Sequence, residues 1–339
     1  MAFFDRSFDF VEDTTKLECF HFFDENDKQH FDEDDFKRLI TSLLNQNGGT
    51  LSESVIKELF LSFDSNADNK IDANEFESLW NNFIIPLKHP VTALLVIDVQ
   101  NDFIGGSLAL KHGSAKQDGY EVVPIINELI EKMHFNVLVY SLDYHPANHI
   151  SFYDNIKLYK LSNENEKSIE DIKLFDTVLF QGTNGKIEQK LWPKHCVSES
   201  WGSELHQNLR VPEESVLIYK GTKPDIDSYS AFWDNMKLAK TELDDLLKQK
   251  NVTHVLVCGL AYDYCVSSTA LDALELGYAA IIIDDATRGI DENVIQLTKE
   301  KLASNNCIFA SCSEIPNIVK GKDIRLEFAQ VFAKSNKNN

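Results

Sequence analysis

The sequence predicts an α/β protein: a three-layer, Rossmann-like parallel sheet with helices on both faces, preceded by a small all-α domain. After Pro90, short apolar runs rich in β-branched residues alternate with helix-like stretches, a pattern typical of a parallel sheet that is covered on both faces. Before Pro86, apolar residues recur at helical spacing. A length of 339 residues with 43% hydrophobic content is enough for two folded domains.

The net charge indicates which partners the chain can bind, and the cysteine content indicates its cellular compartment. A net charge of −21 argues against a nucleic-acid partner, because a polyanion would repel the chain. No apolar run approaches the roughly 18 residues that span a bilayer, and the start of the sequence has no secretory signal. Six cysteines without small-domain spacing are typical of free thiols in a reducing compartment. We therefore expect a cytoplasmic protein without a membrane partner, and the sequence leaves open whether it forms a homo-oligomer.

Between "NNFIIPLKHP" and "VTALLVIDVQ" the apolar pattern changes from helical spacing to short continuous runs, which places a domain boundary near residues 85–91. We expect a helical domain over 1–88 and the sheet domain over 91–330. Within the second domain, residues 155–190 are polar and weakly periodic, which favours a long insertion or lid. The polar end "KSNKNN" predicts a disordered tail over 331–339.

The stretch "DSNADNKIDANE", residues 64–75, has the pattern of a twelve-residue calcium loop. Asn69 stands where such loops usually have glycine, and asparagine tolerates the left-handed backbone. Ile71 is the apolar residue expected to pair with a neighbouring loop. An acidic helix–turn–helix without an ion is the alternative. The calcium ligands expected are side-chain oxygens of Asp64, Asn66 and Asp68, the backbone carbonyl of Lys70, Asp72 directly or through water, and Glu75.

A degenerate copy of the same pattern, "DENDKQHFDEDD", occupies residues 24–35. Lys28 stands where a ligand belongs, and the shorter Asp35 replaces the final glutamate. A cation among the ligands should repel Ca²⁺, so we expect this loop to pair structurally without binding an ion. Residues 15–85 thus resemble an EF-hand pair with one competent site. The residues that the copy retains are Asp24, Asn26, Phe31 and Asp32.

Two expected strand ends carry residues suited to nucleophilic chemistry. "LLVIDVQNDF" puts Asp98 at the carboxyl end of the first strand, where open parallel sheets bind ligands. "HVLVCGLAYDYCVSSTALDALELG" predicts a strand, a tight turn and a helix that begins near Cys265, whose dipole would favour the thiolate. Backbone N–H groups of Ala261 and Cys265 could form an oxyanion hole. The other cysteines interpreted as small buried hydrophobes are Cys258, Cys307 and Cys312.

A third strand end, "SLDYHPANHISF", carries candidate metal ligands. Asp143 and His145 are two residues apart and point the same way in an extended segment. His149 follows four residues later, and "LWPKHCV" supplies His195 from a distant loop. One carboxylate with two or three imidazoles suits Zn²⁺, Fe²⁺ or Mn²⁺.

Five motifs, "IDVQNDF", "DYHPANHISF", "WPKHCV", "YSAFW" and "GLAYDYCV", occur in order over about residues 92–315. Together they resemble those of the nicotinamidases in the isochorismatase-like cysteine hydrolase superfamily. The resemblance implies a catalytic triad of Asp98, Lys220 and Cys265. Lys223 is an alternative to Lys220, although the place of Lys220 at the end of "SVLIYK" favours it.

The resemblance also assigns the metal and substrate contacts. It implies that Asp143, His145 and His195 are metal ligands and that His149 is an additional or second-shell ligand. A non-proline cis bond near Leu260–Ala261 would shape the oxyanion hole. Phe103 and Trp192 would pack against the substrate ring.

The resemblance implies hydrolysis of nicotinamide to nicotinate and ammonia through a cysteine thioester, as part of NAD salvage. One alternative is another small-amide hydrolase of the same superfamily. A second is a calcium-responsive interaction protein with an inactive hydrolase domain. The complete triad and metal set argue against inactivity, because a protein without the reaction has no need to retain both.

Overall fold

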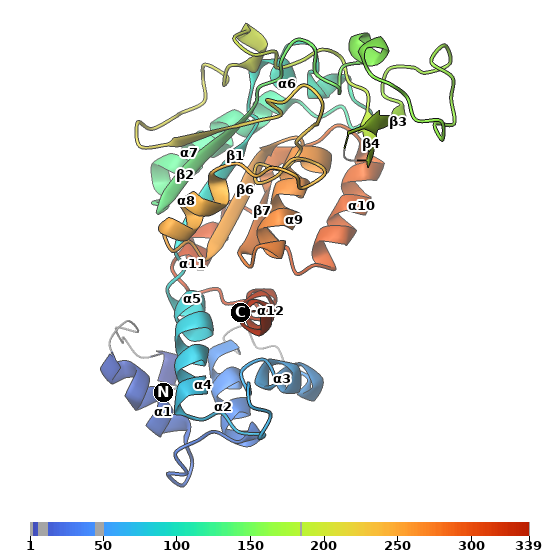
Figure 1. The fold of residues 1–339 in the computed structure, drawn as a ribbon. Coiled ribbons are helices and arrows are strands. Elements are labelled where there is room, and N and C mark those ends of the chain that lie inside the picture. The colour runs from blue at the N-terminus through green and yellow to red at the C-terminus, as the bar shows by residue number, and fades with distance from the viewer. Residues whose placement is uncertain (1–2, 6–12, 45–50, 184, 339) are drawn as a thin grey trace. The chain divides into compact units, whose positions relative to one another are not determined.

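The computed structural model divides the chain into two compact units (Figure 1). The structure describes residues 3–5, 13–44, 51–183 and 185–338. We call residues 1–92, 277–279 and 313–339 the helical unit, and residues 93–276 and 280–312 the sheet unit. The sequence assigned residues up to 330 to the sheet domain, whereas the contacts of residues 313–330 lie within the helical unit.

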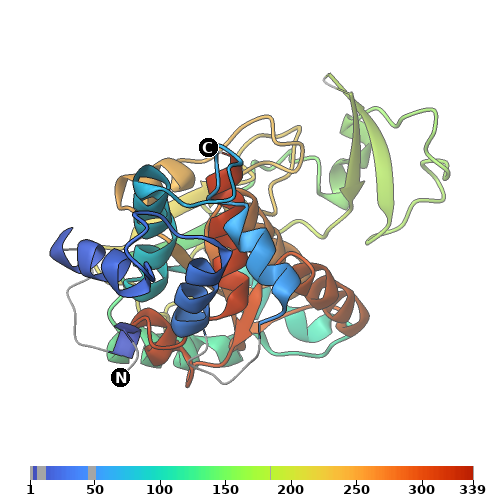
Figure 2. The same cartoon turned by 90° about the horizontal axis from the view of Figure 1, so that it is seen from below.

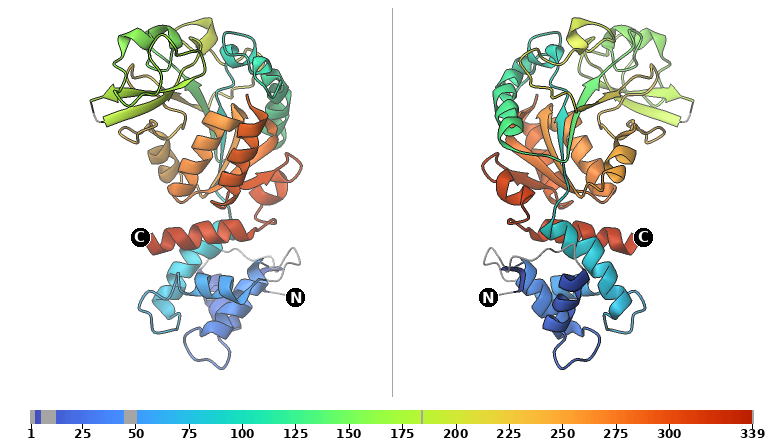
Figure 3. Two further views of the ribbon diagram at one scale, coloured as in Figure 1. Left: turned by 90° about the vertical axis from the view of Figure 1, so that its right-hand side faces the viewer. Right: turned by 90° about the vertical axis from the view of Figure 1, so that its left-hand side faces the viewer.

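The sheet unit is built on a six-stranded parallel sheet with the order β5-β2-β1-β6-β7-β8. β1 and β6 are buried at every position, which explains their nearly continuous apolar sequences. Helices α9 and α10 lie on one side of the sheet and α7 on the other (Figures 1 and 3). The strands are β1 (Thr92–Ile97), β2 (Val137–Asp143), β5 (Val216–Lys220), β6 (His254–Leu260), β7 (Ala279–Arg288) and β8 (Ile308–Ala310).

The helices of the sheet unit follow the expected apolar periodicity. In α7 the buried residues Val122, Ile126 and Leu129 recur every three or four positions, which gives the helix one apolar face. The α-helices are α6 (Asn101–Ile104), α7 (Val122–Lys132), α8 (Leu243–Gln249), α9 (Ser267–Glu275) and α10 (Glu292–Ala303). Shorter turns are η4 (Leu110–His112), η5 (Gly119–Glu121), η6 (Tyr153–Leu158), η7 (Trp201–Ser203) and the π-helical η8 (Tyr262–Val266).

The segment expected as an insertion contains η6 and an antiparallel hairpin of β3 (Thr177–Gly182) and β4 (Gly185–Lys190). Figure 2 shows this hairpin extending outward from the rest of the sheet unit. A small apolar core of its own supports the hairpin, so the segment is a folded element. That core consists of Ile150, Ile156, Ile172, Val178, Phe180 and Leu191.

The helical unit contains the two paired loops that the sequence predicts. Phe31 and Ile71 exchange backbone hydrogen bonds of 3.0 and 2.8 Å, which confirms the expected pairing through Ile71. The rings of Phe20, Phe31 and Phe76 pack together with centroids about 5 Å apart. The helices are η1 (Phe3–Asp5), α1 (Asp13–Phe23), α2 (Glu33–Leu44), α3 (Glu53–Phe60), α4 (Ala73–Leu79), the π-helical η3 (Trp80–Ile84), α5 (Ile85–Lys88), α11 (Ile315–Val319) and α12 (Leu326–Asn338).

Helix α12 corrects the expectation of a disordered tail over 331–339. Residues 331–338 are helical, and Asn339 lies outside the described residues. The side chain of Asn336 donates a hydrogen bond to the Ser62 carbonyl (2.9 Å) and accepts one from the Ser78 hydroxyl (2.8 Å). Because these partners are distant in sequence, the local polar composition gave no sign of them. No helix among the residues that the structure describes is long and apolar enough to cross a bilayer.

Candidate active site

Three neighbouring strands bring charged side chains together at their carboxyl ends. Asp98 follows β1, Asp143 ends β2 and Lys220 ends β5, and Asp143 and Lys220 are register partners. The Nζ of Lys220 lies 2.8 Å from Oδ2 of Asp98, ion-pairs with Oδ1 of Asp143 and donates to the Ser228 carbonyl. Lys220 is buried and Lys223 is exposed, so the structure places Lys220 in the cluster.

Cys265 lies in η8, between β6 and α9, with its Sγ 3.3 Å from Nζ of Lys220. Burial raises the pKa of the Cys265 thiol well above its usual range, although the charge of Lys220 acts to lower it. Burial thus opposes the helix dipole that was expected to favour the thiolate. Cys265 lies two residues before Ser267, the first residue of α9. The thiol needs a base to accept its proton.

Asp98 is the carboxylate that faces this thiol. The Ser141 hydroxyl donates to Oδ1 of Asp98 at 2.6 Å, and Lys220 pairs with Oδ2. Burial raises the pKa of Asp98, while Lys220 opposes the shift. An aspartate with a raised pKa, within reach of a thiol, is suited to accepting and returning a proton.

The backbone around the thiol has the form expected for an oxyanion hole. The Leu260–Ala261 peptide is cis, as the resemblance implied. Ala261 is the N-cap residue of η8, Cys265 lies within η8, and both line the same pocket, so their backbone N–H groups belong to one turn beside the thiol. These two groups are consistent with donors to a developing negative charge.

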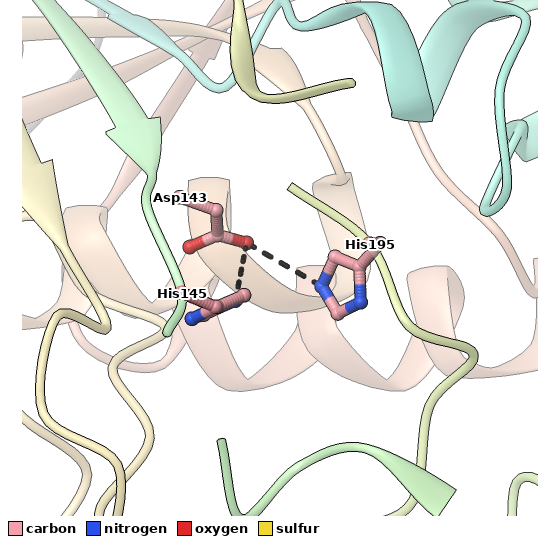
Figure 4. A group of neighbouring side chains, drawn as sticks. All are labelled: Asp143, His145 and His195. Atoms are coloured by element: carbon pink, nitrogen blue, oxygen red, sulfur yellow. Dashed lines mark ion pairs between the residues drawn. The ribbon is translucent and has the colours of Figure 1, made fainter. Parts of the chain in front are cut away.

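Asp143, His145 and His195 form a compact cluster whose potential ligand atoms all lie within 4.8 Å of one another. Oδ2 of Asp143 lies 3.5 Å from Nε2 of His145 and 3.8 Å from Nε2 of His195. Figure 4 shows the aspartate at the end of β2 facing both rings, with His195 coming from a separate loop. Although burial opposes it, Lys220 and His145 hold the pKa of Asp143 well below its usual range. Asp143 is therefore ionised.

Backbone carbonyls fix the orientation of both rings. Nδ1 of His145 lies 2.9 Å from the Gly221 oxygen, and Nδ1 of His195 lies 2.8 Å from the Pro193 oxygen. Since a carbonyl only accepts, each Nδ1 carries the proton and each Nε2 presents its lone pair to the cluster. A Cβ at Gly221, where φ is +63°, would lie 2.3 Å from Cε1 of His145, so glycine is required there.

His149 lies beside this cluster without joining it. Its ring stacks on that of His145 at 4.1 Å, and burial lowers its pKa to about 3. Nε2 of His149 donates to the Ile226 carbonyl (3.2 Å), so Nδ1 accepts from the Ser151 hydroxyl (2.7 Å). Because both nitrogens are already engaged, the geometry favours the second-shell role for His149 over that of a ligand.

A narrow pocket connects the thiol with the histidine cluster. Phe103 and Trp192 both lie in its wall, as expected of residues that contact a ring. Trp192 packs edge-on against Tyr264 at 4.8 Å, and its indole N–H donates to the Tyr229 hydroxyl at 3.3 Å. The pocket is lined by Phe103, Leu108, Asp143, His145, Trp192, His195, Asp227, Tyr229, Ala261, Tyr264, Cys265 and Ile290.

The loop over 64–75 in the helical unit has the backbone of a calcium loop. Asn69 has a left-handed φ of 60°, as predicted for its position. Oδ2 of Asp64 accepts from the Asn69 N–H at 3.0 Å, and Oε1 of Glu75 accepts from the Ser65 N–H at 2.7 Å. Asp72 and Glu75 also form a capping box at the start of α4. The carboxylates of Asp64 and Glu75 therefore point into the loop.

In the loop over 24–35, a protein cation already occupies the place of an ion. The ammonium of Lys28 pairs with Asp32 and with Asp35, the latter at 2.6 Å. Asp35 is fully buried and also pairs with Arg38. These internal ion pairs neutralise the carboxylates that a calcium ion would otherwise need.

Comparison with protein families agrees with both units. Residues 92–311, more than half of the chain, match the isochorismatase domain. The chain belongs to the isochorismatase family. Residues 17–80 match the EF-hand domain pair, so the helical unit contains an EF-hand pair.

Relatives of the isochorismatase domain include several nicotinamidases. The nicotinamidase of Escherichia coli is 38% identical over 205 residues, which cover 60% of this chain and 85% of that protein. A solved nicotinamidase/pyrazinamidase of Acinetobacter baumanii is 32% identical, with a TM-score of 0.56 over 66% of this chain and 98% of that one. The yeast nicotinamidase bound to nicotinaldehyde is 29% identical, with a TM-score of 0.56 over 65% and 99%.

Some residues of the isochorismatase-domain pocket escaped the sequence analysis. Tyr229 and Tyr264 lie inside two of the quoted motifs, so their positions offered a signal that was not used. Leu108 and Ile290 come from segments without any local chemical signature. Asp227 lies two residues before the motif "YSAFW", and its place in the pocket depends on contacts that only the folded chain reveals.

Proposed function

We propose that the isochorismatase domain hydrolyses nicotinamide to nicotinate and ammonia, with Cys265 as the nucleophile, and that the reaction serves NAD salvage. The observation that carries the proposal is that Lys220 joins Asp98, Cys265 and Asp143, so that the thiol and the metal-ligand cluster share one pocket. The nicotinamidases among its relatives support the substrate. The free thiols of all six cysteines support a reducing compartment such as the cytoplasm.

The proposed reaction has two steps around Asp98 and Cys265. Asp98 takes the Sγ proton as the sulfur attacks the carboxamide carbon, and the N–H groups of Ala261 and Cys265 stabilise the oxyanion. The C–N bond then breaks, and Asp98 returns the proton to the departing ammonia. Water, activated by Asp98, cleaves the thioester to release nicotinate and restore the thiol. Lys220 remains charged and compensates the changing charge on both groups.

The donors Asp143, His145 and His195 fit a divalent ion, because both Nε2 atoms face the same carboxylate. Zn²⁺ suits this donor set, as do Fe²⁺ and Mn²⁺. When bound, the ion supplies a Lewis-acid position for the pyridine nitrogen. Phe103 and Trp192 enclose the ring, so that its carboxamide is held towards Cys265.

In the EF-hand pair, we propose one Ca²⁺ in the loop over 64–75 and none in the loop over 24–35. The inward carboxylates of the former and the internal Lys28 ion pairs of the latter support this difference. The proposed role of the ion is structural: it orders the pair of helices α3 and α4 around the loop.

The direct test is ammonia release from nicotinamide by the full chain. The wild-type protein should release ammonia, and Cys265→Ala should lower the rate by at least about a thousandfold, roughly 4 kcal/mol in the barrier. Cys258→Ala is the matched control, because Cys258 is equally buried but lies within β6, away from the pocket.

The alternatives give different results in the same assay. Hydrolysis of another primary amide but not of nicotinamide would favour a different small-amide hydrolase. If no amide were hydrolysed by the metal-loaded protein, an inactive interaction protein would be the better description.

A further inference from the structure

Asp227 is a buried carboxylate for which neither the triad nor the three-ligand cluster accounts. Only 3% of it is exposed, and it lines the pocket beside the metal-ligand cluster. Its carboxylate lies within 4.8 Å of ring nitrogens of His145 and His149. Among the residues that the structure describes, no lysine, arginine or histidine forms an ion pair with Asp227. Its place beside the metal-ligand cluster makes Asp227 a neighbour of any ion bound there.

Gln189 reaches Asp227 from the β3–β4 hairpin. It is 2% exposed, although it lies on a strand whose neighbouring residues are largely accessible. Nε2 of Gln189 donates to Oδ2 of Asp227 at 2.9 Å and to the Lys190 carbonyl at 2.8 Å. Its Oε1 is buried with no hydrogen-bond partner. Because the amide oxygen makes no bond and the bond to Lys190 stays within the hairpin, the donation to Asp227 is the side-chain hydrogen bond that links Gln189 to the pocket.

A second set of bonds holds Asp227 from its own loop. The Ser228 N–H donates to Oδ1 of Asp227 at 2.8 Å, and the Asn235 N–H donates to its backbone carbonyl at 2.8 Å. Each carboxylate oxygen therefore has one donor, one from the loop and one from the hairpin. Two fixed donors set the direction of the carboxylate.

We infer that Gln189 is a positioning residue for the metal centre, holding the charge of Asp227 towards an ion bound by Asp143, His145 and His195. The inference rests on the metal site of the proposed function. This inference gives the β3–β4 hairpin a chemical role, because the Gln189 amide connects the hairpin with Asp227 beside the metal-ligand cluster. The side-chain hydrogen bonds of Gln189 go to Asp227 and to the Lys190 carbonyl, not to the triad, so its loss should affect binding of the ion and of substrate more than the chemical step.

The test measures the Zn²⁺ dissociation constant of the metal-stripped full chain, by competition with a chromophoric chelator. Gln189→Ala should weaken Zn²⁺ binding by about tenfold or more, the range seen when partners of metal ligands are removed. Glu188→Gln is the matched control on the same strand, because Glu188 is exposed, and it should leave the constant unchanged. At saturating Zn²⁺, Gln189→Ala should raise KM for nicotinamide with little change in kcat.

Asp227→Asn keeps the shape of the side chain and removes the charge, so it tests the inference if Gln189→Ala does not fold. It should weaken Zn²⁺ binding to a similar extent. The double variant should be no worse than either single one, because Gln189 acts through Asp227. Additive losses, unchanged Zn²⁺ affinity in folded Asp227→Asn, or a wild-type protein that does not bind Zn²⁺ would overturn the inference. A wild-type protein that binds Zn²⁺ but leaves nicotinamide intact would overturn the proposed substrate alone.

Discussion

At the scale of single residues, Lys220 joins the two halves of the site. Its ammonium contacts Asp98, which faces the thiol, and Asp143, which belongs to the histidine cluster. Burial acts to lower the pKa of Lys220, but the two carboxylates hold it well above the usual range. The ammonium is therefore a permanent charge, and both carboxylates depend on it.

Replacing Lys220 should damage stability as well as turnover. Lys220→Met keeps the length of the side chain but leaves two buried carboxylates without their cation. We expect the free energy of unfolding to fall by about 3–5 kcal/mol, together with loss of ammonia release. Denaturant unfolding measures the first effect. Lys223→Met is the control and should change neither quantity, because Lys223 is exposed. Full stability in Lys220→Met would contradict the ion-pair assignment.

His254 should make stability depend on pH. Burial lowers its pKa to about 3, whereas the unfolded chain titrates near 6.5. Below pH 6.5 the unfolded state therefore binds a proton that the folded state does not. The stability that buried, neutral His254 contributes is fully present above pH 6.5. As the pH falls, the free energy of unfolding decreases by about 1.4 kcal/mol per pH unit down to about pH 3. His254→Gln should reduce the slope of unfolding free energy against pH by that amount between pH 4 and 6. An unchanged slope would mean that His254 is protonated in the fold.

At the scale of elements, the strands and the calcium-loop pattern were predictable because each follows from local sequence. Continuous apolar runs identified β1 and β6, and the residues at strand ends identified Asp98 and Asp143. The contact between Gln189 and Asp227 was not predictable, because it joins a hairpin to a loop 38 positions away. The burial of Cys265 was not predictable for a related reason. Burial, which sequence spacing does not reveal, determines the pKa of its thiol.

The two EF-hand loops should differ in calcium binding. Titration calorimetry on the wild-type chain should give one Ca²⁺ per chain, because Lys28 fills the first loop and four carboxylates remain available in the second. Glu75→Gln should abolish the heat of binding. Asp35→Asn, which alters only the first loop, is the matched control and should retain one ion. Two ions in the wild type, or none, would contradict the assignment.

Helix α12 should stabilise the helical unit through Asn336. Asn336→Ala removes a donor to the Ser62 carbonyl and the acceptor used by Ser78 and Asn82. We expect a loss of about 1–2 kcal/mol in the unfolding transition of this unit. Lys334→Ala, an exposed change on the same helix, should leave the transition in place. An unaltered transition in Asn336→Ala would show that these bonds do not hold the helix.

At the scale of the whole molecule, the boundary near residues 85–91 was visible because apolar periodicity changes there. The contribution of residues 313–339 to the helical unit was not visible. Its contacts connect positions more than 250 residues apart, such as Ser78 and Asn336. A polar terminal sequence has the composition of a disordered tail until its partners are known. Long-range pairing of this kind leaves no local periodic signal.

The return of α12 to the helical unit has a consequence for biosynthesis. The EF-hand helices leave the ribosome first, but the last helix of their unit begins only at Leu326. At about 5–20 residues per second, the roughly 240 residues between Lys88 and Leu326 take on the order of ten to fifty seconds to make. During that interval the nascent EF-hand pair lacks the side chain of Asn336 that links Ser62 and Ser78. The EF-hand pair thus reaches its final packing only after α12 has been made.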